Sequence, residues 1–435
     1  MKCANVLRFG VTGVALVCGA MTLSAAGTIY VGTCGTPNTT TVQAAVTAAG
    51  ANGTVRICPG VYYEQVKITT NLNLTGVASG TGSEVVITSP TKGVVANSAD
   101  LYSPSSLPVA AQILVENASS VNISNVIVDG TGNQIATCGL DLRGIYYQNA
   151  SGILNSVVTR NQELPTGYGG CQSGQGIFVQ SGYSTKGTAN VIIENSSVHA
   201  YQKNGITVDG SGASANIQNN YVAGQGSTTN AAENGIQISD GAAASIINNV
   251  VADDIWAPDT ATDTGDAASG ILIYASENVL VQSNTISTTQ YGIVTVSDST
   301  SGTSNNPQGL GDHTTISGNK IQNTEIFDAI DACSNSNTIA GNIITNATES
   351  GIHLDSTCGS TGKNNTVSLN SVNESCAGIL EGSTSNNISG LATFNVLNTT
   401  LSGNTCSVST GVQAAVIPLV AGTSSGTTPH PTPVR

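Results

Sequence analysis

Charged side chains are scarce in this sequence. They make up 9% of its 435 residues, against about 25% in a typical soluble domain. Lysine is rare, and there are two methionines, four phenylalanines and one tryptophan. This composition disfavours a helix bundle with a charged outer surface. Disorder is also disfavoured, because valine, isoleucine and leucine recur steadily and can supply a packed core.

Basic residues are fewer than acidic ones, with 12 lysines and arginines against 26 aspartates and glutamates and a formal net charge of −14. Nucleic-acid binding rests on neutralising phosphates, so this charge excludes nucleic acid as a partner. The same charge counts against a polyanionic substrate, unless a cation bridges it to the protein.

Long hydrophobic runs are absent after the N-terminus. Lys2 and Arg8 precede a mostly apolar stretch, 9–23, and the small residues 24–26 follow it. This order is typical of a signal peptide over residues 1–26, with the mature chain starting near Gly27. A membrane anchor would need about 20 apolar residues. We therefore expect a secreted protein without a membrane span, located outside the cell, at its surface or in the periplasm.

Zinc-type CxxC pairs are absent too, although eight cysteines remain after the signal peptide. An even number of cysteines in an exported chain predicts disulfides. Neighbours along the sequence are about one repeat apart, so we expect them to pair in order: Cys34, Cys58, Cys138, Cys171, Cys333, Cys358, Cys376 and Cys406.

The sequence does contain a repeat of two short motifs. The first is Gly-Ile-x-aliphatic, found at 144, 176, 205, 235, 270, 292, 351 and 378, with a degenerate copy at Ala329. The second is aliphatic-x-x-Asn-x-aliphatic, which recurs between copies of the first. Short strands with inward aliphatic and outward polar residues fit this pattern. One such coil cannot bury its inner face alone, so stacked coils are required.

These repeats predict an all-β fold, a right-handed parallel β-helix over 27–420, with a disordered tail at 421–435 rich in Ser, Thr and Pro. An antiparallel β-sandwich would not require a two-motif unit, and a leucine-rich repeat lacks its leucine framework here. Asn and Gly suit tight bends because both tolerate positive φ. We expect one asparagine per coil to stack along the axis: Asn125, Asn155, Asn220, Asn249, Asn284, Asn319, Asn342 and Asn370.

Variable spacing between motifs predicts insertions that form surface loops. The clearest are 162–175, 223–234, 252–269 and 297–312. Residues 41–46 read as a short helix that caps the N-terminal end of the stack.

The segment after this helix resembles the start of the pectin-lyase-like superfamily. Gly60-Val61-Tyr62-Tyr63-Glu64-Gln65-Val66-Lys67-Ile68 and the following Leu72-Asn73-Leu74-Thr75-Gly76 are similar to the first coils of pectinesterases and of NosD-like repeat proteins. The resemblance covers about 28–415 and implies the fold. It does not imply a reaction, because the downstream aspartate motifs of pectinesterases and polygalacturonases are absent.

Candidate catalytic residues cluster in the middle coils. A polysaccharide lyase needs a base and a cation that stabilises the anion. Arg160, His199, Lys203 and Asp209 fall close enough in the repeat to line one groove. Glycosidase chemistry instead needs two carboxyl groups about 5–10 Å apart, which adjacent coils offer at Asp209, Glu233 and Asp240, or in a second patch at Asp328, Asp331, His353 and Asp355.

Outward positions of the repeat predict the substrate contacts. Two residues after each motif glycine come Tyr146, Phe178 and Gln237, and we add Tyr201 and the single tryptophan, Trp256, as stacking surfaces. The acidic 252–269 segment is a candidate Ca²⁺ site through Asp253 and Asp254, although a solvated loop around a packed tryptophan is the simpler interpretation.

Two function classes fit these observations. The first is a monomeric extracellular protein that binds or processes a polysaccharide or cell-surface glycan, as a lyase or a hydrolase. The second is a non-catalytic surface, structural or adhesin-like β-helix, which the missing family motifs favour.

Overall fold

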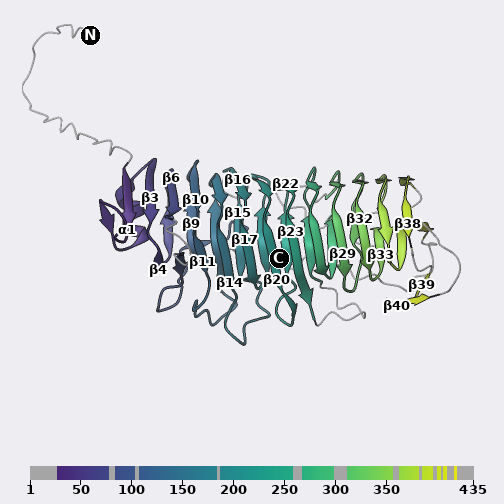
Figure 1. The fold of residues 1–435 in the computed structure, drawn as a ribbon, viewed down its shortest axis with the longest axis horizontal. Helices are drawn as coiled ribbons and strands as arrows, with labels where there is room; N and C mark the ends of the chain where they lie inside the picture. The colour runs from purple at the N-terminus through teal and green to yellow at the C-terminus, as the bar shows by residue number, and fades with distance from the viewer. Residues whose placement is uncertain are drawn as a thin grey trace, which may run out of the picture.

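The computed structural model describes residues 27–77, 84–102, 107–183, 187–257, 267–297, 311–355, 362–381 and 385–394, and strands near the C-terminus. Its coils stack along one long axis, as Figure 1 shows. Consecutive strands of one coil go to three different sheets, and each strand pairs in parallel with its equivalent in the next coil. The parallel β-helix that the repeats predict is confirmed.

Each sheet runs the length of the stack. The first contains β2 (Asn38–Thr39), β1 (Thr28–Val31), β3 (Gly53–Ile57), β6 (Leu72–Gly76), β10 (Val121–Ser124), β13 (Gly152–Asn155), β16 (Ala189–Glu194), β19 (Ala213–Gln218), β22 (Ala243–Ile247), β25 (Leu280–Gln282), β28 (Thr315–Ser317), β31 (Thr338–Ala340), β34 (Thr366–Ser368) and β37 (Asn387–Ser389). The second contains β4 (Gly60–Tyr63), β7 (Val85–Thr88), β11 (Ile127–Asp129), β14 (Val158–Gln162), β17 (Ser197–Tyr201), β20 (Tyr221–Thr228), β23 (Val250–Trp256), β26 (Thr285–Thr289), β29 (Lys320–Thr324), β32 (Ile343–Ala347), β35 (Ser371–Asn373) and β38 (Ala392–Phe394). The third contains β5 (Val66–Ile68), β9 (Pro108–Glu116), β12 (Asp141–Gln148), β15 (Gln175–Gln180), β18 (Asn204–Asp209), β21 (Asn234–Ser239), β24 (Ser269–Tyr274), β27 (Tyr291–Val296), β30 (Ile330–Cys333), β33 (Ser350–Leu354), β36 (Ala377–Glu381) and β41 (Val416–Pro418).

Four further elements, one helix and three strands, complete the described chain. Helix α1 (Val42–Ala49) packs at the N-terminal end of the stack, and the Thr41 hydroxyl accepts a hydrogen bond from the Ala44 amide as its N-cap. Strand β8 (Ser98–Ala99) is antiparallel to β9. Strands β39 (Thr399–Ser402) and β40 (Thr405–Val408) form an antiparallel pair. No described helix is long and apolar enough to cross a membrane.

The inner face of the third sheet is an aliphatic ladder supplied by the Gly-Ile motif. Ile177, Ile206 and Ile236 are register partners in successive strands, and each has no exposed surface. The motif glycines are needed for a reason other than positive φ. A Cβ added to Gly176 would lie 2.5 Å from Val198 Cγ1 and 2.7 Å from the Gly205 carbonyl oxygen. Close approach of the second sheet therefore selects glycine at this position.

The predicted asparagine ladder forms over six residues. In each step, the side-chain amide of one asparagine donates to Oδ1 of the next, at 2.9–3.0 Å, along Asn220, Asn249, Asn284, Asn319, Asn342 and Asn370. The positive φ falls on the residue before the ladder position, such as Asn248 (57°), rather than on the ladder asparagine. Asn125 and Asn155 do not join this chain of bonds: Asn125 itself has φ of 55°, and the Asn155 amide donates to Glu194.

Replacing Asn284 by alanine should destabilise the fold by about 2–3 kcal/mol. The substitution leaves buried groups of Asn249, Asn319 and Ile246 without their hydrogen-bond partner, and each such group costs about 1–3 kcal/mol. Urea unfolding followed by circular dichroism measures the loss. The half-exposed Asn122, which bonds Asn73 on the outer surface, is the matched control. An equal loss in Asn122→Ala would contradict a special role for the ladder.

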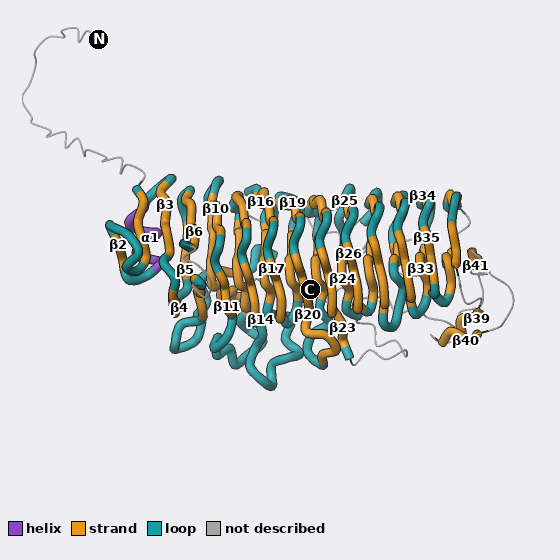
Figure 2. Tube along the Cα trace, in the orientation of Figure 1, coloured by secondary structure: helices purple, strands orange, loops and turns teal. Residues whose placement is uncertain are grey.

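The predicted insertions differ in extent from the observed loops. Strand β20 continues to Thr228 and β23 to Trp256, so the first part of the 223–234 and 252–269 segments is strand. Residues 258–266, most of 297–312, the signal peptide and the tail lie outside the described residues. Figure 2 shows the described loops projecting from one edge of the stack, near β14, β20 and β23.

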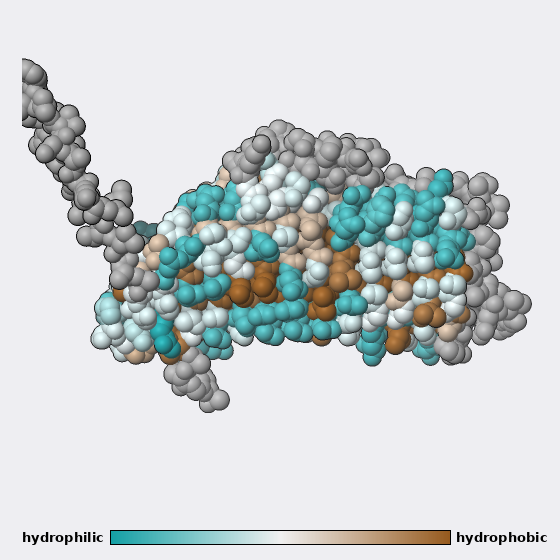
Figure 3. Space-filling model, turned by 90° about the horizontal axis from the view of Figure 1, so that it is seen from above, coloured by the Kyte–Doolittle hydropathy of each residue, from teal (hydrophilic) through white to brown (hydrophobic). Residues whose placement is uncertain are grey.

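Surface hydropathy changes along this solenoid. Seen from above in Figure 3, apolar residues form a broken band along the long axis, with polar residues on either side of it.

Candidate functional site

The outer face of the third sheet is buried through the middle coils. The predicted outward ladder has the expected register, since Tyr146 pairs with Phe178, Phe178 with Thr207, and Thr207 with Gln237. Its side chains are nevertheless at most 9% exposed. The predicted outward contacts on this face are therefore not open to solvent, because residues outside the repeat cover them.

A cavity of about 210 Å³ lies between this face and its cover. Its walls come from β12, β15, β18, β21 and β24 and from the segments before β9 and β15: Asp100, Tyr102, Leu107, Asp141, Arg143, Gln172, Gln175, Phe178, Lys203, Asn204, Thr207, Asp209, Gln237, Ser239, Asp240 and Tyr274. Carboxyl groups outnumber cations in this lining, four to two. The sheet-3 pocket, as we call it, is the candidate functional site.

Two carboxyl groups meet at one wall of the pocket. Asp209 accepts hydrogen bonds from Gln180 Nε2 at 2.7 Å, Tyr183 Oη at 2.8 Å and Ser239 Oγ at 2.9 Å. The Tyr183 hydroxyl also lies 3.2 Å from Asp240 Oδ2. One phenol oxygen is therefore within hydrogen-bond distance of both carboxyl groups.

Electrostatics at this pair favours the protonated form. Burial raises the pKa of Asp209, and the charge of Asp100 adds to this rise. Burial also raises the pKa of Tyr183, with the charges of Asp209 and Asp240 acting in the same direction. The phenol therefore keeps its proton and remains a hydrogen-bond donor. Such perturbed carboxyl groups in a cavity are typical of functional sites.

Arg143 forms the floor of the pocket beside this pair. Its guanidinium carbon lies 3.7 Å from the Phe178 ring centroid and 4.4 Å from that of Tyr146. Nε donates to Asp141 Oδ2 at 2.8 Å, and Nη2 bonds Asp100. The side chain is 1% exposed. Arg143 therefore anchors Asp100, which comes from a covering segment, onto the third sheet.

Several polar atoms in the lining have no hydrogen-bond partner in the described part of the chain. Three are acceptors, on Asp141 (Oδ1), Gln172 (Oε1) and Gln175 (Oε1), and one is a donor, Nη1 of Arg143. Buried polar groups normally find partners. This excess of acceptors suits a ligand that brings several hydroxyl donors into the pocket.

The structure does not bring the four predicted catalytic residues into one groove. Lys203 and Asp209 both line the sheet-3 pocket, where Lys203 Nζ donates to the Ala232 carbonyl at 2.6 Å. Arg160 and His199 are register partners on the second sheet instead. Arg160 bonds Asp129 at 2.7 Å, and burial followed by the charge of Arg160 lowers the pKa of His199.

The predicted substrate contacts also separate by burial. Phe178 and Gln237 line the pocket. Tyr146 and Tyr201 have no exposed surface. Inside the protein, the Tyr146 hydroxyl donates to Gln180 at 2.6 Å, and the Tyr201 hydroxyl donates to Asp254 at 2.5 Å. Trp256 is half-buried and donates to the Asn230 carbonyl at 2.7 Å, which fits a packed tryptophan.

The two aspartates of the predicted Ca²⁺ site differ in environment. Asp254 is fully buried against Tyr201, whereas Asp253 is half-buried with φ of 63°. Neither belongs to a described group of three or more potential metal ligands. Ca²⁺ binding in this region stays a prediction.

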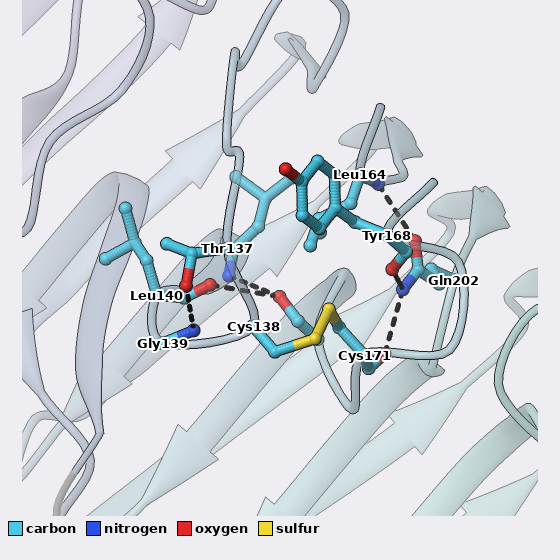
Figure 4. Close-up of a disulfide and its surroundings, with 10 residues drawn as sticks. Thr137, Cys138, Gly139, Leu140, Leu164, Tyr168, Cys171 and Gln202 are labelled. Atoms are coloured by element: carbon cyan, nitrogen blue, oxygen red, sulfur yellow. Dashed lines mark hydrogen bonds between the residues drawn. A yellow bond between two sulfur atoms is a disulfide. The ribbon is translucent and has the colours of Figure 1, made fainter. Parts of the chain in front are cut away.

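The cysteine pairing agrees with the sequence where both partners are described. Cys34 bonds Cys58, and Cys138 bonds Cys171. Cys333 and Cys376 are disulfide-bonded as well. Cys358 lies outside the described residues, and Cys406 is described only by its backbone in β40. Figure 4 shows the second bridge beside Gln202, whose side chain bonds the backbone of Leu164, Tyr168 and Cys171. The bridge thus fixes the segment that carries Gln172 to the pocket.

Sequence reasoning missed the residues that close the pocket. Asp100, Tyr102 and Tyr183 lie outside the repeat motifs, so no periodicity indicates their position. Asp240 was a candidate only as a glycosidase carboxyl, and Arg143 carried no assigned role. One usable signal is charge, because Asp141 and Arg143 both occur inside a strand that is otherwise buried.

Comparisons with known proteins agree with this architecture. The profile of the family described as right handed beta helix region matches residues 61–308 and 181–367. No curated protein sequence matches significantly. Similar solved structures include an exopolygalacturonase from Thermotoga maritima, at 10% identity and a TM-score of 0.48, covering 80% of this chain and 86% of that one.

Two further structures show the same likeness of fold. The GH136 lacto-N-biosidase from Eubacterium ramulus has 12% identity and a TM-score of 0.47, over 80% of this chain and 62% of that one. The chain thus spans less than two thirds of the biosidase. An alginate lyase from Paenibacillus sp. has 12% identity and a TM-score of 0.43, over 85% of this chain and all of that one. The family match covers more than half of the sequence, and the chain belongs to the right-handed β-helix family.

Proposed function

We propose that this protein binds an extracellular glycan in the sheet-3 pocket and hydrolyses it with the Asp209–Asp240 pair. One observation carries the proposal: two buried carboxyl groups that share contact with the Tyr183 hydroxyl lie in a cavity whose unpartnered polar atoms are mostly acceptors. Glycoside hydrolysis requires one carboxyl group that donates a proton and one that is ionised. The disulfides fit an oxidising compartment outside the cytoplasm.

Charge favours a neutral glycan over a polyuronate. Four carboxyl groups line the pocket, and Arg143 is already bonded to two of them. A lyase must neutralise the substrate carboxylate and stabilise the anion that forms next to it. The pocket is acidic and supports this poorly. Sugar hydroxyls, in contrast, are donors that match Asp141 Oδ1, Gln172 Oε1 and Gln175 Oε1, and Phe178 offers an apolar surface beside them.

The proposed roles follow from the hydrogen bonds. The protonated member of the Asp209–Asp240 pair donates to the glycosidic oxygen, and the ionised member acts as base or nucleophile. Tyr183 and Gln180 hold Asp209 in place, and Lys203 contacts the sugar from the same wall. Since the reaction needs a protonated carboxyl group, turnover should fall as the pH rises through the raised pKa of Asp209.

A panel of neutral and acidic polysaccharides tests this function. We expect purified protein to release reducing ends from a neutral glycan. Asp209→Asn and Asp240→Asn should each lower kcat by about 10²–10⁴-fold. Asp312 is the control, because it is a buried, hydrogen-bonded aspartate outside the pocket, and Asp312→Asn should leave kcat unchanged.

Two outcomes would contradict hydrolysis. Unsaturated products that absorb in the ultraviolet would show a lyase instead. Glycan binding without turnover, unchanged by either pocket variant, would favour the non-catalytic adhesin-like alternative.

A further inference from the structure

A second buried cluster lies further along the third sheet, outside the sheet-3 pocket. Asp331 on β30 and His353 on β33 are register partners in adjacent coils, and Asp328 precedes β30. Each of these three residues offers one ligand atom, and the atoms all lie within 4.8 Å of one another. All three side chains are at most 1% exposed. The cluster plays no part in the function proposed above.

The hydrogen bonds of Asp328 fix the orientation of the histidine. Asp328 accepts from the Ser350 amide at 2.9 Å and from the Ser350 hydroxyl, and its Oδ2 lies 3.1 Å from His353 Nδ1. A carboxylate at Nδ1 places the ring proton there and leaves the lone pair on Nε2. Histidines that ligate metals usually have this arrangement, with a carboxylate or carbonyl behind the ring.

Two atoms of this cluster have no hydrogen-bond partner in the described structure. They are His353 Nε2 and Asp331 Oδ1, and both are buried. Buried groups of this kind are normally paired or bound to a metal.

The charge of the cluster also calls for a cation. Besides Asp328 and Asp331, two further carboxyl groups, those of Asp355 and Glu349, act electrostatically on Asp331, and His353 is the one imidazole that opposes them. Burying several carboxylates without compensation is costly. A divalent cation would offset this charge where a single protonated imidazole does not.

We propose that the cluster of Asp328, Asp331 and His353 binds a divalent transition-metal ion such as Zn²⁺ or Mn²⁺, with His353 Nε2 and Asp331 Oδ1 as ligands. The imidazole nitrogen selects against Ca²⁺, which takes oxygen ligands. Cys333 is near Asp331 but is disulfide-bonded, so its sulfur is no thiolate ligand. Asp328 is the positioning residue behind the histidine. Because the ligands come from adjacent coils, the metal would tie these coils together.

Metal analysis of the full chain tests this site. The protein is refolded separately with Zn²⁺, Mn²⁺ or Ca²⁺, dialysed, and measured by mass spectrometry of elements and by thermal unfolding. We expect about one equivalent of Zn²⁺ or Mn²⁺ per chain and none of Ca²⁺, with a higher unfolding midpoint in the metal-bound form. His353→Gln and Asp331→Asn should lose the metal. The half-buried His199 lies outside the cluster, so His199→Gln should keep it.

A measurement on the unaltered chain tests the site even if the variants fail to fold. Electron spin-echo spectroscopy of the Mn²⁺ form should show coupling to one imidazole nitrogen. The proposal is overturned if the refolded chain retains neither metal, if bound Mn²⁺ shows no nitrogen coupling, or if His353→Gln folds and keeps a full equivalent. A glycan-hydrolysis assay is independent of all three results.

Discussion

Replacing Arg143 by methionine should destabilise the protein by about 3–5 kcal/mol, the usual cost of breaking a buried ion pair on one side. Arg143 is the cation for both Asp141 and Asp100 and is 1% exposed. Burial raises the pKa of Asp141 even with Arg143 beside it. Without the guanidinium, two carboxyl groups remain in a site that water hardly reaches. Methionine keeps much of the stem volume, so the loss reports on charge rather than on a cavity.

Lysine should not rescue this position. A guanidinium bonds two carboxylates in its plane while its faces contact Tyr146 and Phe178, and an ammonium group cannot reproduce that geometry. Adding Asp141→Asn to Arg143→Met should recover part of the stability, because one unpaired charge is then removed.

A second arginine in the same fold provides the control. Arg160 also donates Nε to an aspartate, Asp129, at 2.7 Å, but its side chain is 32% exposed. Exposed ion pairs contribute about 0–1 kcal/mol, so Arg160→Met should have little effect in the same urea titration. Equal losses of stability in the two variants would show that the ion pairs of Arg143 contribute no more than the exposed pair of Arg160.

The fold was predictable because the repeat encodes burial directly. An inward aliphatic residue such as Ile206 recurs at the same position of each coil. Such a residue can be buried only when the coils stack on one another. The asparagine ladder was also predictable from Asn220 onward. Asn125 and Asn155 resemble the ladder residues in sequence, but neither joins the ladder. Their local conformation and hydrogen bonds differ, and the repeat pattern does not indicate this difference.

The candidate site was only partly predictable. Lys203 and Asp209 flank one strand of the third sheet and do meet in a pocket. Arg160 and His199 lie on the second sheet, because residues equally spaced from the motifs can belong to different faces of the coil. The burial of the outer face depends on segments such as 100–102, which carry no repeat. Tertiary contacts of these segments could not be read from the sequence.

Acidic pH should stabilise this protein through two buried carboxyl groups, those of Glu233 and Asp254. Burial, followed by the charge of Asp254, raises the pKa of Glu233 well above its ordinary value. Burial raises the pKa of Asp254 as well, against the hydrogen bond from Tyr201. Glu233 Oε2 and Asp254 Oδ2 have no described hydrogen-bond partner. Both groups are therefore more easily protonated in the folded chain than in the unfolded one.

The sign of the pH effect follows from proton binding. A carboxyl group with a raised folded-state pKa contributes its full stability below its unfolded pKa, near 4, and loses that contribution as the pH rises toward the folded-state value. Stability should fall by about 1.4 kcal/mol for each pH unit over which the folded state keeps one extra proton. Urea unfolding at several pH values above 4, with a chelator present, measures this slope.

Glu233→Gln should flatten the slope and raise stability at neutral and alkaline pH, because glutamine cannot ionise. Glu277 is half-exposed, and Glu277→Gln should leave the slope unchanged. If Ca²⁺ restored stability at high pH in the original chain but not in Glu233→Gln, a cation would be replacing the proton, as the acidic residues beside Trp256 first suggested. If the original chain showed no loss of stability between mildly acidic and alkaline pH, Glu233 and Asp254 would be ionised in the folded chain and their raised pKa values would be refuted.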